Sequence, residues 1–243
     1  MNSSEPEFRP EGNGIRFGLT AIKNVGEAAS RSVMVARERL SGFRDFGQFC
    51  NEADNRLVSK GVTESLIKAG ALDSLGSNRA HMIALLTQRR SQSGNSQRSS
   101  LPPGESAEWS QADRLAREKE VLGVYLSGHP LDEYRSQLSA VTHQATSSLE
   151  ELPDNTSVTL IGLLDDLTVR RSRKGNSWGT GTLEDLHGRN DLIVFADALE
   201  PFQGLVKSGA VAVVKGRVRR EVGARPKVLV AGIGPLRRKD EGN

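Results

Sequence analysis

VTLIGLLDDLTVRRSRKGNSWGTGTLEDLHGRNDLIVF, residues 158–195, alternates apolar runs with turn residues. The runs at Val158–Leu164, Ser177–Leu183 and Asp191–Phe195 carry the β-branched, aromatic and apolar residues that favour strands. Between them, Arg173-Lys174-Gly175-Asn176 and His187-Gly188 supply residues suited to tight turns. The pattern predicts three strands joined by two hairpin connections.

Two further runs, Ala210–Arg219 and Lys227–Ile233, extend this pattern towards the C-terminus. The segment Ala198–Val206 between them and the first three strands is predicted to be a helix that closes one end of a barrel. This order is typical of a small five-stranded β-barrel of the OB type, whose curved face and loops commonly hold single-stranded nucleic acid. Because a helical region precedes the barrel, the predicted fold class is α+β.

A second signal lies upstream, where Ile22-Lys23-Asn24-Val25-Gly26-Glu27-Ala28-Ala29 has the tight turn of a helix-hairpin-helix element. Backbone N–H groups at the start of a helix can bind a phosphate. We expect the N–H groups of Val25 to Glu27 to face outward, with Lys23 adding positive charge. Asn24 tolerates the left-handed conformation, and Gly26 is expected to supply backbone freedom that a valine would remove. The alternative is a plain turn between two helices.

The rest of the N-terminal half is predicted to be helical. Glu27–Leu40 has the apolar spacing of an amphipathic helix, and a further helical pair spans about Ser59–Ala69 and Asn78–Arg89. The phenylalanines Phe43, Phe46 and Phe49 recur every third residue and are expected to close a helical core. Met1–Gly14 is polar and contains proline and glycine, so it is expected to be extended or poorly ordered.

A polar stretch divides the two halves of the chain. Arg90–Glu108 has almost no apolar content, which is typical of a flexible linker. Ser110 and Asp113 then form a predicted capping box that begins a helix running to about Leu122. The expected organisation is an extended lead-in over 1–14, a helix-hairpin-helix domain over 15–90, a linker over 91–109, a connecting helical segment over 110–156, the barrel over 157–236 and a basic tail over 237–243.

Composition limits the possible classes of protein. The formal net charge is only +3, but Lys215–Lys239 contains nine Lys and Arg residues and one acid, Glu221. Such local charge suits a phosphate backbone or an acidic partner, or is simply a solvated edge. Cys50 is the only cysteine, which excludes an internal disulfide. No apolar run approaches the roughly 20 residues that span a bilayer, so a cytoplasmic protein without membrane contact is expected.

The acidic and histidine residues do not predict an active site. Metal-dependent phosphoryl transfer needs carboxylates that converge on metal ions, and Asp165-Asp166 is the only adjacent acidic pair of that kind. We expect this pair to lie in a turn at the end of the first barrel strand. The four histidines have no metal-ligand spacing, and His129, which precedes a proline, is expected to cap or pack locally. No catalytic residue, metal or cofactor is therefore predicted for this chain.

The barrel carries the residues expected to bind a single strand. Arg170, Arg171, Arg173 and Lys174 crowd one hairpin, and Trp178 follows shortly after. Cations with an aromatic ring are what binding without strong sequence preference needs. Arg217 and Arg219 in the fourth predicted strand are further candidates for nucleic-acid contact. Phe195 is expected to be a core residue.

Several strings of residues resemble the C-terminal part of the bacterial DNA polymerase III alpha subunit. The resemblance covers about Asn2 to Leu236. The matching strings are Ile15–Leu19, Ala21–Glu27, Glu64–Ala71, Asp73–Gly76, Glu118–Glu120, Leu122-Gly123, Tyr125–Leu131, Leu183–Asp185 with Gly188, and Val194-Phe195. It implies duplex binding by the helix-hairpin-helix part and template binding by the barrel. It also implies that the chain is a piece of a longer polymerase, whose catalytic domain would use Mg²⁺ and has no counterpart here.

The same resemblance bears on partners. Gln97-Arg98-Ser99-Ser100-Leu101-Pro102 lies where members of that family carry a short peptide that docks into the sliding clamp. Gln97, Ser100 and Leu101 match it, whereas a proline replaces the aromatic residue, so the segment is either a degenerate clamp motif or plain linker. The predicted partners are duplex and single-stranded DNA, with the clamp and other replisome subunits as further candidates. The alternative function is a protein-interaction module that docks an acidic replisome partner and does not touch DNA.

Overall fold

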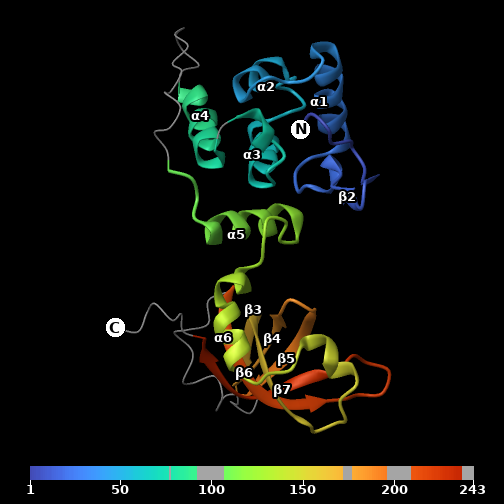
Figure 1. Cartoon of the computed structure of the whole chain (residues 1–243), viewed down its shortest axis with the longest axis vertical. Coiled ribbons are helices and arrows are strands. Elements are labelled where there is room, and N and C mark those ends of the chain that lie inside the picture. Colours follow the sequence, from blue (N-terminus) through green and yellow to red (C-terminus); the bar gives the residue numbers. More distant parts are fainter. Residues whose placement is uncertain (77, 92–106, 172–176, 196–208, 237–243) are drawn as a thin grey trace. The chain divides into compact units, whose positions relative to one another are not determined.

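The computed structural model describes residues 1–76, 78–91, 107–171, 177–195 and 209–236, without the side chains of residues 89–91, 169, 171 and 177. The chain divides into two compact units, Met1–Gly128 and His129–Asn243. The first unit is helical and the second is built on a β-barrel (Figure 1).

The helical unit contains five α-helices and two short 3₁₀ helices within the described residues. They are η1 (Leu19–Ala21), α1 (Glu27–Leu40), α2 (Phe46–Glu52), α3 (Lys60–Lys68), η2 (Asp73–Leu75), α4 (Arg79–Ser91) and α5 (Gln111–Leu122). Side-chain caps begin four of these α-helices, since Asp45, Ser59, Asn78 and Ser110 each accept a hydrogen bond from a backbone N–H of the first turn. The capping box predicted at Ser110 is half formed, because the Asp113 carboxylate accepts from the Ser110 hydroxyl (2.7 Å).

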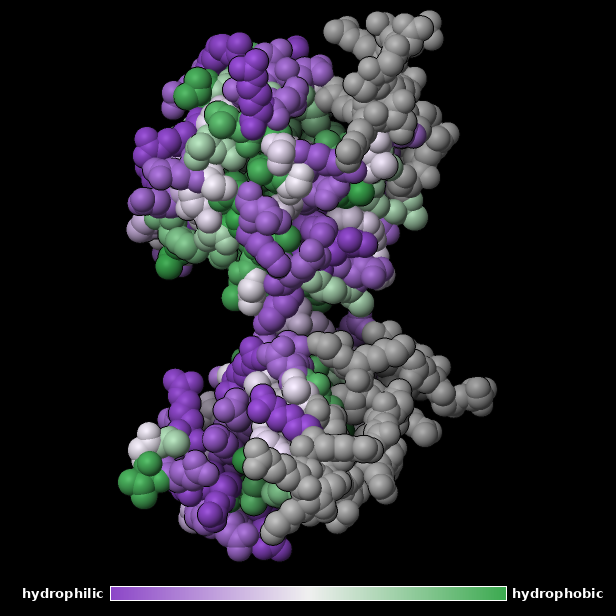
Figure 2. Space-filling view, turned by 180° about the vertical axis from the view of Figure 1, so that it is seen from behind, coloured by the Kyte–Doolittle hydropathy of each residue, from purple (hydrophilic) through white to green (hydrophobic). Residues whose placement is uncertain are grey.

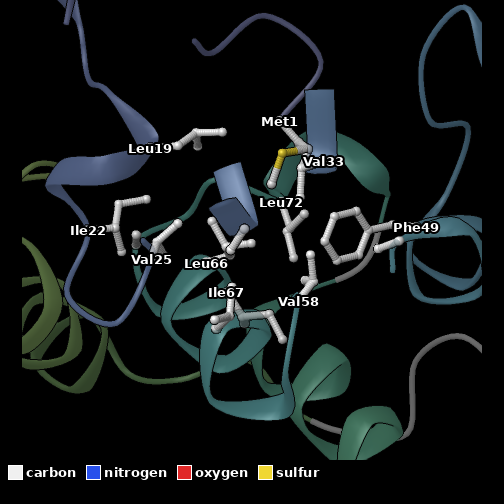
Figure 3. Packing of buried hydrophobic residues seen from close by; sticks show 14 of the residues in the cluster. Met1, Leu19, Ile22, Val25, Val33, Phe49, Val58, Leu66, Ile67 and Leu72 are labelled. Carbon is white, nitrogen blue, oxygen red and sulfur yellow. The ribbon is translucent and has the colours of Figure 1, made fainter. Parts of the chain in front are cut away.

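Buried apolar side chains from all parts of this unit form one core (Figure 3). Leu19, Ile22 and Val25 from the hairpin meet Val33 of α1 and Leu66 of α3 there. The three phenylalanines are buried as predicted: the ring centroids of Phe43 and Phe49 are 5.2 Å apart, and those of Phe46 and Phe49 are 6.4 Å apart. The hairpin is thereby fixed to the helices by apolar packing.

The lead-in over residues 1–14, expected to be extended or poorly ordered, is anchored to the helical unit at its first residues and is exposed over residues 7–14. The Met1 side chain is buried in the core, and the Asn2 side chain both donates to the Phe43 carbonyl oxygen (2.8 Å) and accepts from the Phe43 N–H (3.0 Å). Strands β1 (Arg9–Glu11) and β2 (Gly14–Arg16) form a small hairpin. These contacts join residues about 40 positions apart. The local composition of the first residues could not predict such distant contacts.

A buried ionic cluster joins α5 to the rest of the helical unit. The Glu118 carboxylate, which is fully buried, accepts from Arg79 Nη1 (2.8 Å) and from the N–H groups of Leu126 (3.1 Å) and Ser127 (2.9 Å). Arg79 also pairs with Asp73 (2.7 Å). Burial alone would raise the pKa of Glu118, but these hydrogen bonds outweigh it and hold the pKa below its ordinary value of 4.5. Glu118 therefore stays ionised inside the fold.

The second unit contains the predicted five-stranded barrel. Its strands are β3 (Ser157–Arg171), β4 (Ser177–Glu184), β5 (Arg189–Phe195), β6 (Ala210–Arg219) and β7 (Lys227–Pro235), and the sheet closes in the order β3-β4-β5-β7-β6. All neighbours are antiparallel except β5 and β7. Alternate side chains point inward, as in the buried series Leu192 and Val194 on β5. The barrel and the α+β class are confirmed.

One strand is longer than predicted. The sequence indicated that the first barrel strand ends at Leu164 and that Asp165-Asp166 begins a turn. Instead β3 continues to Arg171 through a β-bulge between Asp165 and Thr168, where Asp166 has a φ of 52°. A bulge lets a strand bend sharply, so that β3 can pair with both β4 and β6 in the closed barrel. The sequence did not distinguish a turn from a bulge here, because aspartate tolerates the left-handed conformation that Asp166 adopts and is also common in turns.

Short helices precede the barrel: η3 (Pro130–Tyr134), α6 (Arg135–Ala140) and η4 (Thr146–Glu150). His129 caps η3, as predicted, because its Nδ1 accepts from the Leu131 N–H (3.1 Å). The Asp185 carboxylate accepts from the Thr146 N–H and hydroxyl (both 2.7 Å), and η4 contributes Leu149 to the barrel core. The predicted closing helix, 198–206, lies outside the described residues. None of the helices that the structure describes is long and apolar enough to cross a membrane.

Candidate nucleic-acid interface

The hairpin turn between η1 and α1 has the left-handed residue at Asn24, whose φ is 69°. The Asn24 amide donates to the Ser65 hydroxyl (3.2 Å), which fixes the turn to α3. Gly26 has a φ of −76° and an extended backbone, and a Cβ added there would meet nothing within 4 Å. The expectation that Gly26 supplies special backbone freedom is therefore wrong, because Asn24 takes the conformation that glycine would otherwise provide.

Fewer N–H groups of this turn are open than the sequence suggested. Val25 is buried and its N–H donates to the Ile22 carbonyl oxygen (3.0 Å), while the Lys23 N–H donates to Val121 (2.8 Å). Gly26 and Glu27 begin α1 without a side-chain cap, and both are exposed. Within the described residues no acceptor is recorded for their N–H groups, and the exposed Lys23 lies three residues before Gly26 in the sequence. The Glu27 carboxylate is paired with Arg31 (2.5 Å).

A second turn of the same pattern precedes α4, and sequence reasoning missed it. Leu72, Leu75 and Gly76 repeat the spacing of Ile22, Val25 and Gly26, with the two apolar residues buried in both turns. Here the helix start is filled by the chain itself. Asn78 Oδ1 accepts from the His81 N–H (2.6 Å), and the Glu108 carboxylate accepts from the N–H groups of Arg79 (2.8 Å) and Ala80 (3.2 Å).

Glu108 therefore takes the position that an external anion would take at α4. Burial alone would raise its pKa, but hydrogen bonds from the N–H groups of Trp109, Arg79 and Ala80 outweigh burial and lower the pKa below its ordinary value. The start of α1 differs in having no such carboxylate among the described residues. Of the two matching turns, the one at Asn24 is the turn whose helix start is open.

The outer face of β4 and β5 brings together aromatic and polar side chains. Trp178 pairs in register with Phe195, Thr180 with Ile193, and Thr182 with Asp191. Trp178 is half-buried, and the Arg170 guanidinium lies 6.0 Å from the centroid of its ring. Phe195 is 54% exposed, so its predicted place in the core is wrong. The alternation of β5 places Leu192 and Val194 inside and Phe195 outside.

A groove of about 510 Å³ lies on this face. Its lining is Asp166, Trp178, Thr180, Gly181, Thr182, Asp191, Leu192, Ile193 and Lys227. Two of its polar groups are already paired: the Arg189 guanidinium contacts Asp166 Oδ2 (2.5 Å) and Thr182 Oγ1 (2.7 Å). The groove therefore combines an apolar and aromatic floor with few open polar groups, as ligand sites usually do.

The predicted cations are not all gathered at this groove. Arg170 is exposed beside Trp178, Arg171 pairs with Ser177 in the β3–β4 ladder, and Arg173 and Lys174 lie outside the described residues. Arg217 and Arg219 are exposed on β6, which neighbours β3 and β7 and not β4 or β5. Arg217 donates to Asn155 (3.2 Å), and Arg219 pairs with Asp154 (3.6 Å).

The structure gives no support to the remaining candidate sites, the clamp-like segment and the acidic pair Asp165-Asp166. Gln97, Ser100 and Leu101 of the clamp-like segment lie outside the described residues. Asp165 and Asp166 lie in the bulge, where Asp166 pairs with Arg189. Across the part of the chain that the structure describes, no three His, Cys, Asp or Glu side chains are grouped as metal ligands.

Comparison with known proteins gives a consistent result. A family model described as a helix-hairpin-helix motif matches residues 1–82. DNA polymerase III subunit alpha of Aquifex aeolicus is 35% identical over 218 residues, which are 89% of this chain and 18% of that protein. The same subunit of Thermus aquaticus is 32% identical over 97% of this chain and 20% of that protein.

Solved structures match the chain only weakly. The mitochondrial single-stranded DNA binding protein Rim1 of S. cerevisiae has a TM-score of 0.31 at 16% identity, over 35% of this chain and 98% of that one. The hypothetical protein ygiW of E. coli has a TM-score of 0.30 at 16% identity, over 40% of this chain and 92% of that one.

A further relative of the same name matches most of the chain. The Vibrio cholerae subunit adds 32% identity over 90% of this chain, and the chain spans about a fifth of the length of the relatives it matches. Over about nine-tenths of its length, the chain is related to the C-terminal region of the bacterial DNA polymerase III alpha subunit.

Proposed function

We propose that this chain is the DNA-binding C-terminal part of a replicative polymerase and performs no catalysis by itself. In this proposal the hairpin at Asn24 holds the phosphate backbone of primer-template duplex, and the outer face of β4 and β5 holds single-stranded template. Nucleotide transfer and its Mg²⁺ ions belong to the rest of the longer protein. The relatives are named DNA polymerase III subunit alpha, and this chain matches a fifth of their length.

The observation that carries the proposal is the pairing of Trp178 with the exposed Phe195 beside the groove and Arg170. The exposed ring of Phe195 leaves apolar surface in contact with water, and stacking against a base would bury that surface. Stacking contributes about 1–3 kcal/mol per base and tolerates any base. Two rings directly opposite each other on neighbouring strands, with the Arg170 guanidinium near Trp178, would form a stacking platform with a cation for the phosphate backbone.

The hairpin supports the duplex half of the proposal. The start of α1 presents N–H groups with no acceptor among the described residues, and a helix N-terminus favours an anion there. Phosphate oxygens are suitable acceptors, and the ammonium group of Lys23 adds attraction without base recognition. The site is small, so we propose that it positions the duplex and that further contacts supply most of the affinity.

The proposal is tested by binding of the full chain to a fluorescein-labelled single strand of mixed sequence, followed by fluorescence anisotropy. The logarithm of affinity is expected to fall linearly with the logarithm of salt concentration, with a slope of about −0.7 for each phosphate contact. Binding that is undetectable at low salt, or independent of salt, would contradict the barrel's assignment.

A second candidate function is docking of an acidic protein partner. It is favoured by the outer face of β6, where Lys215, Arg217 and Arg219 are exposed away from the groove. Competition distinguishes the two functions: an acidic partner bound at β6 alone would stay bound when single-stranded DNA fills the groove. Other replisome subunits are candidate partners of this kind, whereas the sliding clamp is a candidate partner of the segment with Gln97, Ser100 and Leu101.

A further inference from the structure

The groove on β4 and β5 contains one open carboxylate. Asp166 is paired with Arg189, and the same guanidinium donates to the Thr182 hydroxyl. Asp191 also lines the groove and is exposed, and no hydrogen bond or ion pair is recorded for it within the described residues. Lys227 lies in the same lining, but the acid it approaches is Glu221, at 4.0 Å. Asp191 is thus available to a ligand in the groove.

Asp191 and the aromatic pair lie at different points of the same ladder. Phe195 pairs with Trp178, and Asp191 pairs with Thr182, four residues along each strand. At about 3.3 Å per residue this separation is about 13 Å. A strand whose bases stack on Trp178 and Phe195 can therefore bring another base over Asp191, with Thr180 and Ile193 between them.

The carboxylate of Asp191 determines which groups of a nucleotide can bind beside it. An ionised carboxylate is only an acceptor, so it repels phosphate oxygens and base carbonyl oxygens and attracts N–H groups. Guanine presents two adjacent donors, N1–H and the N2 amino group, which match the two carboxylate oxygens. Thymine presents a single N–H between two carbonyl oxygens, and adenine and cytosine present an amino group beside an acceptor nitrogen.

We propose that Asp191 makes this groove prefer guanine in single-stranded nucleic acid, by accepting from N1–H and the N2 amino group together. The inference rests on the proposed single-strand binding and adds base selectivity to it. A good bidentate contact discriminates against the wrong base by about five- to 150-fold in affinity. The remaining contacts, stacking and phosphate attraction, tolerate any base, so the preference belongs to one position of the bound strand.

The test uses the full chain and three labelled oligonucleotides of thymine that carry guanine, inosine or thymine at one central position. Inosine keeps N1–H and lacks the N2 amino group. Wild-type protein is expected to bind the guanine probe about tenfold more tightly than the thymine probe, with inosine between them. Asp191→Asn is expected to bind all three within about twofold, because its amide places a donor against one of the guanine donors.

Glu151→Gln is the matched control, since it removes the same charge from an exposed position outside the groove lining. It is expected to retain the guanine preference. Equal binding of the three probes by wild type, or a preference that survives Asp191→Asn, would overturn the inference while leaving single-strand binding intact. If wild type binds none of the probes, the proposed function fails as well. A thermal melt of Asp191→Asn confirms that the variant is folded.

Discussion

At Asn24 a single side chain does two things that set the geometry of the hairpin. It takes the left-handed backbone conformation, with a φ of 69°, and its amide binds Ser65 on α3. A glycine could supply the first but not the second. The extended backbone of Gly26 leaves room for a side chain, so the turn does not require a glycine at that position.

Two aromatic residues of the barrel can be tested one at a time. Phe195→Ala is expected to weaken single-strand binding by about 1–3 kcal/mol and to leave the salt slope nearly unchanged, because stacking releases no counterions. Its melting temperature should stay close to that of wild type, since the ring is 54% exposed. Trp178→Ala should weaken binding similarly and also lower the melting temperature, because the ring is half-buried. Anisotropy and thermal melts separate the two effects, and unchanged affinity in both variants would refute the stacking platform.

Glu118 is expected to be the most sensitive acid for stability. Glu118→Ala leaves Arg79 buried with one partner fewer and removes the acceptor of two backbone N–H groups. Breaking a buried pair in this way costs about 3–5 kcal/mol of unfolding free energy. The exposed pair of Glu120 with Lys68 is the control, and Glu120→Ala should cost about 1 kcal/mol or less. Urea unfolding followed by far-UV circular dichroism measures both, and equal losses would contradict the role of Glu118.

The same carboxylate gives a pH dependence. Because its pKa is lower in the folded protein than the ordinary 4.5, its contribution to stability is complete above that value. The contribution is lost as pH falls through the lower folded-state pKa, when the carboxylate becomes protonated beside Arg79. The difference in unfolding free energy between wild type and Glu118→Ala should therefore shrink in acid.

Among the five α-helices that the structure describes in the helical unit, α1 is the one whose start has no side-chain cap. Lys23→Glu is expected to weaken duplex binding and to reduce the salt slope by about 0.9, the value for one lost phosphate contact. Arg39→Glu is the control: it makes the same change of charge near the other end of α1, about 20 Å away along a helix of 14 residues. Equal losses in both variants would indicate general attraction and not a site at the turn. Anisotropy with a labelled duplex at several salt concentrations provides the comparison.

Local patterns predicted elements well and long-range contacts poorly. Glu27–Leu40 and Ala210–Arg219 have the predicted bounds, because apolar spacing and turn residues act within a few positions. The anchoring of Glu108 at α4 joins residues 29 positions apart, and the packing of Met1 depends on the whole core. Phe195 was misplaced because its run of apolar residues does not show which alternate set faces inward until the register with β4 is known.

For the whole molecule, the two compact units provide two kinds of surface. In the proposed function, the helical unit supplies a helix start for a phosphate, and the barrel supplies a groove lined by Trp178, with Phe195 beside it, for bases. On the face of the helical unit drawn in Figure 2, hydrophilic residues predominate and apolar residues are scattered among them. Phosphate contacts serve a duplex whose bases are already paired, whereas stacking requires bases that are unpaired. The two units are therefore expected to divide duplex and single-strand binding between them.

Crossed binding measurements on the full chain test this division most directly. Lys23→Glu and a Trp178→Ala, Phe195→Ala double variant are each titrated against a labelled duplex and a labelled single strand at one salt concentration. Lys23→Glu should weaken duplex binding and leave single-strand binding within about twofold, while the double variant should lose about tenfold or more for the single strand and little for the duplex. Parallel losses on both ligands, in either protein, would contradict the assignment of the two DNA forms to separate units.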